Sequence, residues 1–334
     1  MRRLIALILL MVSYGSTSAD DLVITTWNLE TIGASSGRGW ASGFGKDQLP
    51  PRTNGQLRKI AHLIRDTLKS DIIGVQEVAI THRAPSGASR CKALDRLTTH
   101  LGTGWQYTLP WVDEIPEDHA NLFSAYLYNT DRVRKVQIYG MNVANPWLAG
   151  ARLFPRKPLI GYFEAIKDGS RTNDFVIVNI HLKSGQGHDE NHLIAATVLE
   201  WELTRSLEDH GIKESDRIIM GDFNDNPYRR KSNGKPEYSG ALYEHLKFKG
   251  YLDLVTADSH STRMNNGLDS IIDHILVNTS AKRHIVQDRA DIYVPGRSES
   301  GFPETLATWR SDFSDHFPIS FQLKIESRDD DTDF

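Results

Sequence analysis

Five short polar segments stand at the ends of apolar, strand-like runs in this chain of 334 residues. They are Thr26-Trp27-Asn28-Leu29-Glu30, Gln76-Glu77-Val78, Asn179-Ile180-His181-Leu182-Lys183, Gly221-Asp222-Phe223-Asn224 and Ser314-Asp315-His316-Phe317-Pro318. One carboxylate or histidine at a strand end is common. Five such segments spread over nearly the whole chain predict one acidic, histidine-bearing cleft.

The residue types in this cleft suit the hydrolysis of a phosphodiester, which needs a divalent cation, an activated water and help for the departing oxygen. The candidate oxygen donors are Glu77, Asp222, Asp273, Asp315, Asn28 and Asn224. Hard oxygen donors suit Mg²⁺, Mn²⁺ or Ca²⁺ better than zinc. His181 and His316 can exchange protons near neutral pH, because the reference pKa of histidine is about 6.5. The combination predicts metal-assisted phosphodiester hydrolysis.

Each residue alone also has an ordinary structural explanation. Asp222 and Asn224, shortly before Pro227, could simply form a turn, because both side chains bond to nearby backbone. A lone histidine is more often a surface or core residue than a catalytic one. His188, Asp189, Glu190 and His192 could be mistaken for a zinc site. They stand at an expected helix start, where acidic residues favour the helix dipole. The catalytic interpretation rests on the joint pattern.

Strands and helices must alternate to position these segments. Leu22 to Trp27 predicts a buried strand, Gln56 to Lys69 a helix, and Asp71 to Glu77 a strand. Further helices are expected at 94–101 and 192–207, and further strands at 105–109, 124–128, 159–167, 174–181, 217–220, 270–277 and 317–325. Trp201, at the centre of the long helix, is expected in the core. The glycine-rich stretch from Gly33 to Asn54 predicts a long loop beside the cleft.

In this order the segments resemble the endonuclease/exonuclease/phosphatase superfamily over nearly the entire chain, and within it the deoxyribonuclease I-like branch. The residues that carry the resemblance are Thr26-Trp27-Asn28-Leu29, Asp71-Ile72-Ile73-Gly74-Val75-Gln76-Glu77-Val78, Phe154-Pro155-Arg156-Lys157-Pro158, His181, Gly221-Asp222-Phe223-Asn224, Asp273 and Ser314-Asp315-His316-Phe317-Pro318. The resemblance implies an α/β (α+β) fold: a four-layer α/β/β/α sandwich of two mixed β-sheets flanked by helices, with the cleft at the strand ends.

The resemblance also implies a role for each site residue. Glu77 would hold the main metal with Asn28 nearby, and Asp315 would lie at the same site. Asp222 and Asn224 would bind phosphate, position water or hold a second metal. His316, oriented by Asp273, would contact phosphate and assist water activation. His181 would assist the leaving oxygen, and Arg156 would contact phosphate. Which histidine is the acid and which the base stays open.

Three features depart from that branch. No acidic residue that could orient His181 is evident in Asn121 to Asn129. The disulfides of animal deoxyribonuclease I are absent, because Cys91 is the only cysteine. His274 stands where the branch has an arginine, which puts substrate contacts there in question.

The N-terminal residues have the pattern of a secretory signal: Met1-Arg2-Arg3, an apolar run, and small residues up to Ala19. We expect cleavage after Ala19, a single domain over 20–326, and an acidic tail at 327–334. Removing residues 1–19 takes away two arginines and no acids, so the formal net charge moves from −4 to −6. That balance gives no support for a stable nucleic-acid-binding protein, yet a nuclease needs only a local basic rim.

The sequence therefore predicts a secreted or periplasmic, divalent-metal-dependent nuclease that cuts DNA, or also RNA, endonucleolytically. Mg²⁺ is the expected cofactor, with Mn²⁺ or Ca²⁺ as alternatives. Nucleic acid is the expected partner, and no stable membrane association or obligate protein partner is evident. The alternative is a sphingomyelinase-type or other phosphodiesterase or phosphatase of the same superfamily. A non-catalytic binding module or toxin subunit is disfavoured, because no central site residue is missing.

Overall fold

A computed structural model describes residues 21–34, 50–113, 122–143, 147–148, 151–183, 189–226, 245–247, 249–256, 261–264, 270–295 and 308–326. The expected signal segment 1–19, the acidic tail 327–334 and most of the loop from Gly33 to Asn54 lie outside these residues. The predictions for those segments, and for the domain limits 20–326, stay predictions.

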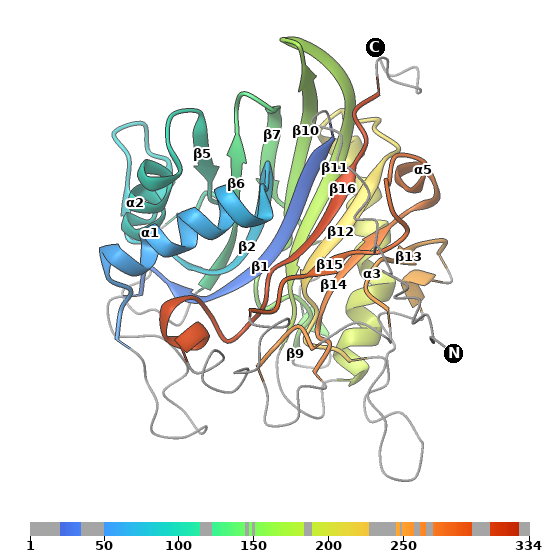
Figure 1. Ribbon diagram of the computed structural model, residues 1–334. Helices are drawn as coiled ribbons and strands as arrows, with labels where there is room; N and C mark the ends of the chain where they lie inside the picture. The colour runs from blue at the N-terminus through green and yellow to red at the C-terminus, as the bar shows by residue number, and fades with distance from the viewer. Residues whose placement is uncertain are drawn as a thin grey trace, which may run out of the picture.

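Two six-stranded sheets form the centre of the molecule (Figure 1). The first sheet has the order β15 (Asp291–Ile292), β16 (Ile319–Leu323), β1 (Leu22–Ile32), β2 (Ile72–Ala79), β6 (Leu122–Asn129) and β5 (Trp105–Thr108). The second has the order β13 (Leu252–Asp253), β14 (Asp273–Val277), β12 (Arg217–Asp222), β11 (Ser170–His181), β10 (Leu159–Lys167) and β7 (Val133–Gly140). Both sheets are mixed, because β1–β2 and β11–β12 run parallel and the other neighbours antiparallel.

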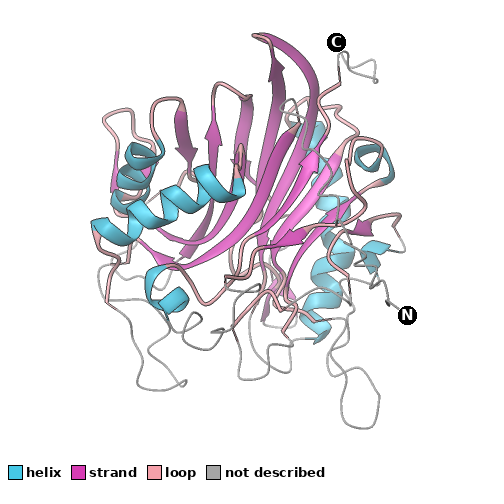
Figure 2. Ribbon diagram, in the orientation of Figure 1, coloured by secondary structure: helices cyan, strands magenta, loops and turns pink. Residues whose placement is uncertain are grey.

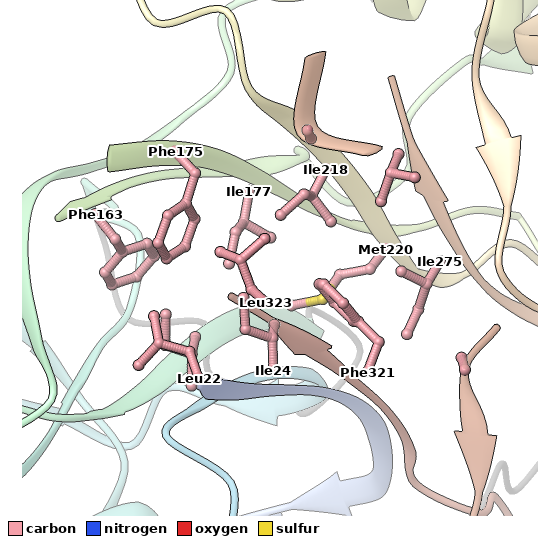
Figure 3. Close-up of a cluster of buried hydrophobic side chains, with 14 of the residues drawn as sticks. Leu22, Ile24, Phe163, Phe175, Ile177, Ile218, Met220, Ile275, Phe321 and Leu323 are labelled. Atoms are coloured by element: carbon pink, nitrogen blue, oxygen red, sulfur yellow. The ribbon is translucent and has the colours of Figure 1, made fainter. Parts of the chain in front are cut away.

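The two sheets pack face to face over an apolar core (Figure 3). Alternate residues of each strand point inward, as the period of two in a strand requires. The labelled side chains at this interface are Leu22, Ile24, Phe163, Phe175, Ile177, Ile218, Met220, Ile275, Phe321 and Leu323. The same alternation, continued to the strand ends, determines which polar side chains face the cleft.

Helices cover the outer face of each sheet (Figure 2). Helix α1 (Asn54–His62), its continuation η1 (Leu63–Leu68) and α2 (Lys92–Leu101) share an apolar cluster with outward residues of the first sheet. Helix α3 (Asp189–Asp209) packs in the same way on the second sheet, and α5 (Thr279–Lys282) follows β14. This arrangement confirms the predicted four-layer sandwich.

Helix α1 begins where the sequence provides a capping box. The hydroxyl of Thr53 accepts a hydrogen bond from the backbone N–H of Gln56, and the side chain of Gln56 accepts one from the backbone of Thr53. Leu57 and Ile60 then fall on the buried face. The expected helix over 56–69 is confirmed, with its start two residues earlier.

Several short or edge elements were not predicted. They are β7, β13, β15, α5 and the hairpins β3 (His82–Arg83) with β4 (Ser89–Arg90) and β8 (Trp147–Leu148) with β9 (Ala151–Arg152). The expected core position of Trp201 is wrong, because 59% of its surface is exposed. Within the described part of the chain, no helix is both long and apolar enough to span a membrane.

Candidate functional site

The predicted site residues lie at the edge of the sandwich where strands of both sheets end or begin. In chain order they are Asn28 in β1, Glu77 in β2, Arg156 before β10, His181 and Asp222 as the last residues of β11 and β12, Asn224 after β12, Asp273 as the first residue of β14, and Asp315 and His316 before β16. Both sheets therefore contribute to the site.

Strand alternation turns the second-sheet residues toward the cleft. His181 lies four residues after Ile177, and Asp222 lies two residues after Met220. Both apolar residues belong to the core between the sheets, so the polar residues point to the same side. Asp273 has the same relation to Ile275, another residue of that core. These positions follow from sequence periodicity alone.

Glu77 reaches the cleft only because β2 is irregular. By alternation it would point outward like Val75, which packs in the outer cluster. Its φ is +60°, and the register with β6 shifts between Val75 and Val78. A bulge of this kind re-aims a side chain at the end of a strand. The two carboxylate oxygens of Glu77 accept hydrogen bonds from Thr31 N at 3.0 Å and from Asn28 Nδ2 at 3.2 Å.

Asp222 Oδ2 is the point at which the contributions of the two sheets meet. Asn28 Nδ2 donates to it at 3.1 Å. His181 Nε2 lies 3.5 Å away and His316 Nε2 lies 3.9 Å away. The other oxygen, Oδ1, accepts the backbone N–H of Asn224 at 2.9 Å. Both histidines can therefore act on a group bound beside this carboxylate.

His316 is held firmly in place. Its Nδ1 lies 2.8 Å from Asp273 Oδ2. Its backbone N–H donates to Ser314 Oγ at 3.1 Å, and that hydroxyl donates to Asn28 O at 2.6 Å. The indole N–H of Trp27 donates to His316 O at 3.1 Å. The ring thus turns Nε2 toward the cluster.

His181 has no comparable support among the described residues. Its side chain is buried, and Nδ1 has no hydrogen-bond partner there. The described strand Leu122–Asn129 carries no acidic residue, as the sequence indicated. The ring is therefore positioned by packing and by its Nε2 contacts.

Two predicted phosphate-binding residues meet beside His181. Arg156 Nη1 donates to Leu182 O at 3.5 Å, and Asn224 Nδ2 donates to the same carbonyl at 3.2 Å. Burial lowers the pKa of the Arg156 guanidinium, and the negative charges of Glu77 and Asp222 oppose that effect. A cation thus lies on the His181 side of the carboxylate cluster.

The two histidines have opposite pKa shifts. Burial, with the positive charges of Arg156 and His316, holds the pKa of His181 well below its usual 6.5. Burial also opposes the charging of His316, but the carboxylates of Asp273 and Asp315 outweigh it and raise its pKa to about 10. One ring is therefore neutral and the other protonated at neutral pH.

The carboxylates form a group suited to a divalent cation. Donor atoms of Asp222, Asp273 and His316 all lie within 4.8 Å of one another, and all three residues are buried. Burial and the charge of Asp273 raise the pKa of Asp222 to about 6. A cation would relieve this repulsion. With Glu77 and Asp315 nearby, the oxygen donors fit Mg²⁺ or Mn²⁺.

The amide of Asn28 is already engaged. Its Oδ1 accepts the backbone N–H of Glu30 at 3.0 Å, and its Nδ2 bridges Glu77 and Asp222. In this arrangement Asn28 orients two carboxylates of the site.

Three arginines near the site were missed. Arg263 pairs with Asp315, with Nη2 3.1 Å from Oδ2. Arg310 Nη2 lies 3.2 Å from Glu30 Oε1, and Arg52 Nη1 donates to Glu30 O at 3.0 Å. None of the three belongs to one of the five segments, so no local pattern marked them.

His274 does not take the place of a substrate-binding arginine. It follows Asp273 in β14 and points to the opposite side, where Nδ1 lies 2.8 Å from Asp253 Oδ2. Its Nε2 lies 3.2 Å from Asp225 O, and its ring packs edge-on against Phe223. His274 is a buried structural residue.

Among the described residues, no zinc site is formed around His192. His192 Nε2 lies 2.9 Å from the backbone carbonyl of Lys183, which satisfies that nitrogen. His188 and the side chains of Asp189 and Glu190 lie outside the described residues.

Comparisons with known proteins agree with this geometry. The structure is similar to that of a Bacteroides thetaiotaomicron protein of the endonuclease/exonuclease/phosphatase family. The match covers 92% of this chain and 99% of the other, with 19% identity and a TM-score of 0.56. A mannosyl-6-phosphatase from the same organism matches 90% of this chain over 99% of its own, with 19% identity and a TM-score of 0.53. A 3'-5' exonuclease from Neisseria meningitidis matches 91% of this chain over 100% of its own, with 16% identity and a TM-score of 0.53.

These structures share the fold, and their names span different phosphoester substrates. No curated protein sequence matches the chain. The sequence profile of the Endonuclease/Exonuclease/phosphatase family matches residues 25–316, which include every predicted site residue from Asn28 to His316. The chain belongs to the endonuclease/exonuclease/phosphatase family.

Proposed function

We propose that the protein is a divalent-metal-dependent phosphodiesterase that cuts DNA within the strand, with RNA as a further candidate substrate. The observation that carries the proposal is the placement of His181 and His316 around one carboxylate oxygen, 3.5 and 3.9 Å from Asp222 Oδ2. Hydrolysis of a phosphodiester needs one proton removed from water and one delivered to the leaving oxygen. Two histidines at one position supply both.

The metal would be held by Glu77, Asp222 and Asp315, with Asp273 and His316 close to it. When bound, it would polarise the phosphate oxygens and lower the pKa of a coordinated water. Nε2 of one ring can accept the proton of the attacking water, and Nε2 of the other can donate a proton to the leaving oxygen. Asp273 keeps the His316 ring in that orientation through the 2.8 Å contact at Nδ1.

Phosphate would be bound on the His181 side by Arg156 and Asn224, which meet at Leu182 O. Nucleic acid as substrate is supported by the Neisseria exonuclease, one of whose structures is described as a 3' phosphatase bound to a product DNA hairpin. Secretion or periplasmic export is proposed from residues 1–19. N-terminal sequencing of the exported protein should then begin at Asp20.

A lipid phosphodiester is the second candidate. A short hairpin of β8 (Trp147–Leu148) with β9 (Ala151–Arg152) precedes Arg156 in the chain. A sphingomyelinase-type enzyme of the same superfamily is the alternative that the sequence left open, so sphingomyelin belongs in the test.

The test compares the mature protein with His181→Ala on supercoiled DNA, RNA, sphingomyelin, mannose 6-phosphate and a 3'-phosphorylated oligonucleotide, with Mg²⁺, Mn²⁺ or chelator. His100→Ala is the matched control, because His100 lies on α2 away from the cluster. Metal-dependent nicking of DNA that His181→Ala loses and His100→Ala keeps would support the proposal. Turnover of sphingomyelin or of a phosphomonoester without nicking would contradict it.

A further inference from the structure

Arg263 is a cation of the site to which no function has been given above. Its backbone is tied to the segment that carries Asp315 and His316. Arg263 forms an isolated antiparallel bridge with His316, and Met264 N donates to Asp315 O at 2.7 Å. Phe317 N donates to Thr262 O at 2.8 Å. The position of Arg263 is therefore coupled to the catalytic segment itself.

The guanidinium of Arg263 is only partly used. Its Nε and Nη2 donate to one oxygen, Asp315 Oδ2, at 3.2 and 3.1 Å. A guanidinium carries five N–H donors, and Nη1 makes no hydrogen bond within the described residues. The side chain is 44% exposed, whereas that of Asp315 is 14% exposed. Donors thus remain available on the accessible side of the ion pair.

The charge of the site makes such donors useful. Glu77, Asp222, Asp273 and Asp315 are all acidic, and a phosphodiester is an anion that must approach them. Arg156 supplies positive charge beside Leu182, on the His181 side. Arg263 supplies it beside Asp315, on the His316 side, and its electrostatic influence extends to Asp222 and His181.

We propose that Arg263 binds the substrate phosphate through its free N–H donors, from the side of the site opposite Arg156, while keeping its contact with Asp315. This inference rests on the proposed function, since it assigns a residue to phosphate recognition in the same site. Arginine suits this task, because its planar fork can hold a carboxylate on one edge and a phosphate oxygen on the other. The competing explanation is that Arg263 only positions Asp315.

The experiment measures binding in the presence of chelator, so that no turnover occurs. The probes are inorganic phosphate, followed by calorimetry, and a short phosphorothioate oligodeoxynucleotide, followed by fluorescence anisotropy. Arg263→Ala should weaken both by about 10- to 100-fold, the range for a hydrogen bond to a charged group. Arg263→Lys should recover part of the loss, and Arg58→Ala, the same charge change on the exposed face of α1, should change neither.

Removal of Arg263 also leaves the charge of Asp315 uncompensated, which alone could repel phosphate. The double variant Arg263→Ala/Asp315→Asn is therefore compared with Asp315→Asn. If Arg263 contacts phosphate, the double variant still binds about 10-fold more weakly.

Equal phosphate affinity of the double variant and Asp315→Asn would overturn the inference and leave Arg263 as a positioning residue for Asp315. If Arg263→Ala fails to fold by circular dichroism, the same comparison is made with Arg263→Gln. If the wild-type protein cuts no oligonucleotide, the nuclease proposal fails, but the measurements with inorganic phosphate still decide for or against Arg263.

Discussion

At the scale of single residues, the site depends on the different surroundings of similar side chains. His181, His274 and His316 are all buried, yet only two of them face the cleft. His316 is supported by Asp273 and His274 by Asp253, while Nδ1 of His181 has no partner in the described residues. The role of each histidine therefore depends on which side of the sheet its ring faces and on the side chain that contacts its Nδ1.

Glu77→Gln tests the predicted metal site. Glutamine keeps one acceptor for the hydrogen bonds that Glu77 receives but removes a negative oxygen next to the cation. We expect Mn²⁺ affinity to fall by about 10- to 100-fold, the cost of losing a charged ligand contact, with an unchanged circular dichroism spectrum. Calorimetric titration with Mn²⁺ measures this, and unchanged affinity would remove Glu77 from the metal site.

His274→Gln tests the buried pair with Asp253. Burial lowers the pKa of His274, but the charge of Asp253 outweighs it, so the pKa is raised above the 6.5 expected when unfolded. The stabilisation is therefore fully present below about pH 6.5 and is lost as pH rises through the folded pKa. We expect the variant to be about 3 kcal/mol less stable at pH 6, and the gap to the wild type to narrow at higher pH.

Urea unfolding followed by tryptophan fluorescence at pH 6 and pH 8.5 measures that gap. His100→Gln, at a half-buried position of α2 where Nε2 lies 2.9 Å from Asn54 Oδ1, is the matched control. A gap that does not change with pH would show that the pair does not depend on the charge of His274.

At the scale of elements, a polar layer below the cleft joins the two sheets. Asn179 of β11 donates to Val75 O at 3.1 Å and to Ala125 O at 3.0 Å, and it accepts from Gln76 Nε2 at 2.6 Å. All of these partners belong to the first sheet. One side chain thus fixes the offset between the sheets directly below the catalytic residues.

Asn179→Ala would take one buried hydrogen bond from each of two carbonyls, Val75 O and Ala125 O, whereas Gln76 Nε2 keeps Thr26 Oγ1 at 3.0 Å and Gly74 O at 3.1 Å. We expect a loss of about 3 kcal/mol, because each buried polar group left unsatisfied costs about 1–3 kcal/mol. Asn142→Ala, at an exposed position after β7, is the control and should change stability by less than about 0.5 kcal/mol. Urea unfolding compares the two, and equal losses would contradict the role of the polar layer.

Gly221 is required where β12 approaches β11. Its φ is +141°, and an added Cβ would lie 2.0 Å from Ile180 O. We expect Gly221→Ala to cost more than about 3 kcal/mol or to prevent folding, since the backbone next to Asp222 would have to move. Gly211→Ala, with φ of +67° and no atom near its added Cβ, should cost only about 1–2 kcal/mol. Thermal unfolding of the two variants distinguishes the cost of a steric clash with the neighbouring strand from the cost of a positive φ alone.

Periodicity predicted β1, β2, β11, β12 and their polar ends, because buried strands with a regular alternation carry a strong local signal. It could not predict β7, whose residues from Val133 to Gly140 are mostly half-buried or exposed at the edge of a sheet. Nor could it predict that Arg263 faces Asp315, since that contact spans 52 positions in sequence. Trp201 was misassigned because its place midway along α3 does not determine whether its side chain lies on the buried or the exposed face of the helix.

At the scale of the whole molecule, the site is a junction between two sheets. The first sheet and its adjoining loops provide Asn28, Glu77 and the segment of Asp315, and the second provides His181 and Asp222. A ligand held by both groups should therefore stabilise the packing of one sheet on the other.

We expect Mn²⁺ to raise the free energy of unfolding by about 2.7 kcal/mol when its concentration is one hundred times the dissociation constant. Thermal unfolding with and without chelator measures the shift. Glu77→Gln/Asp222→Asn, which lacks two charges of the proposed site, should show none. A wild-type protein with the same melting temperature in both buffers would contradict a preformed metal site.

The position of β16 in the first sheet determines how late in synthesis the site can form. This strand lies between β15 and β1, and its residue Leu323 pairs with Leu22. Ribosomes deliver the chain from its N-terminus, so β1 waits for its antiparallel neighbour until almost 300 further residues have been added. Asp315 and His316 arrive with that same strand. A nascent chain therefore cannot assemble the full set of proposed catalytic groups until residue 316 has emerged, and premature termination upstream would yield an inert fragment.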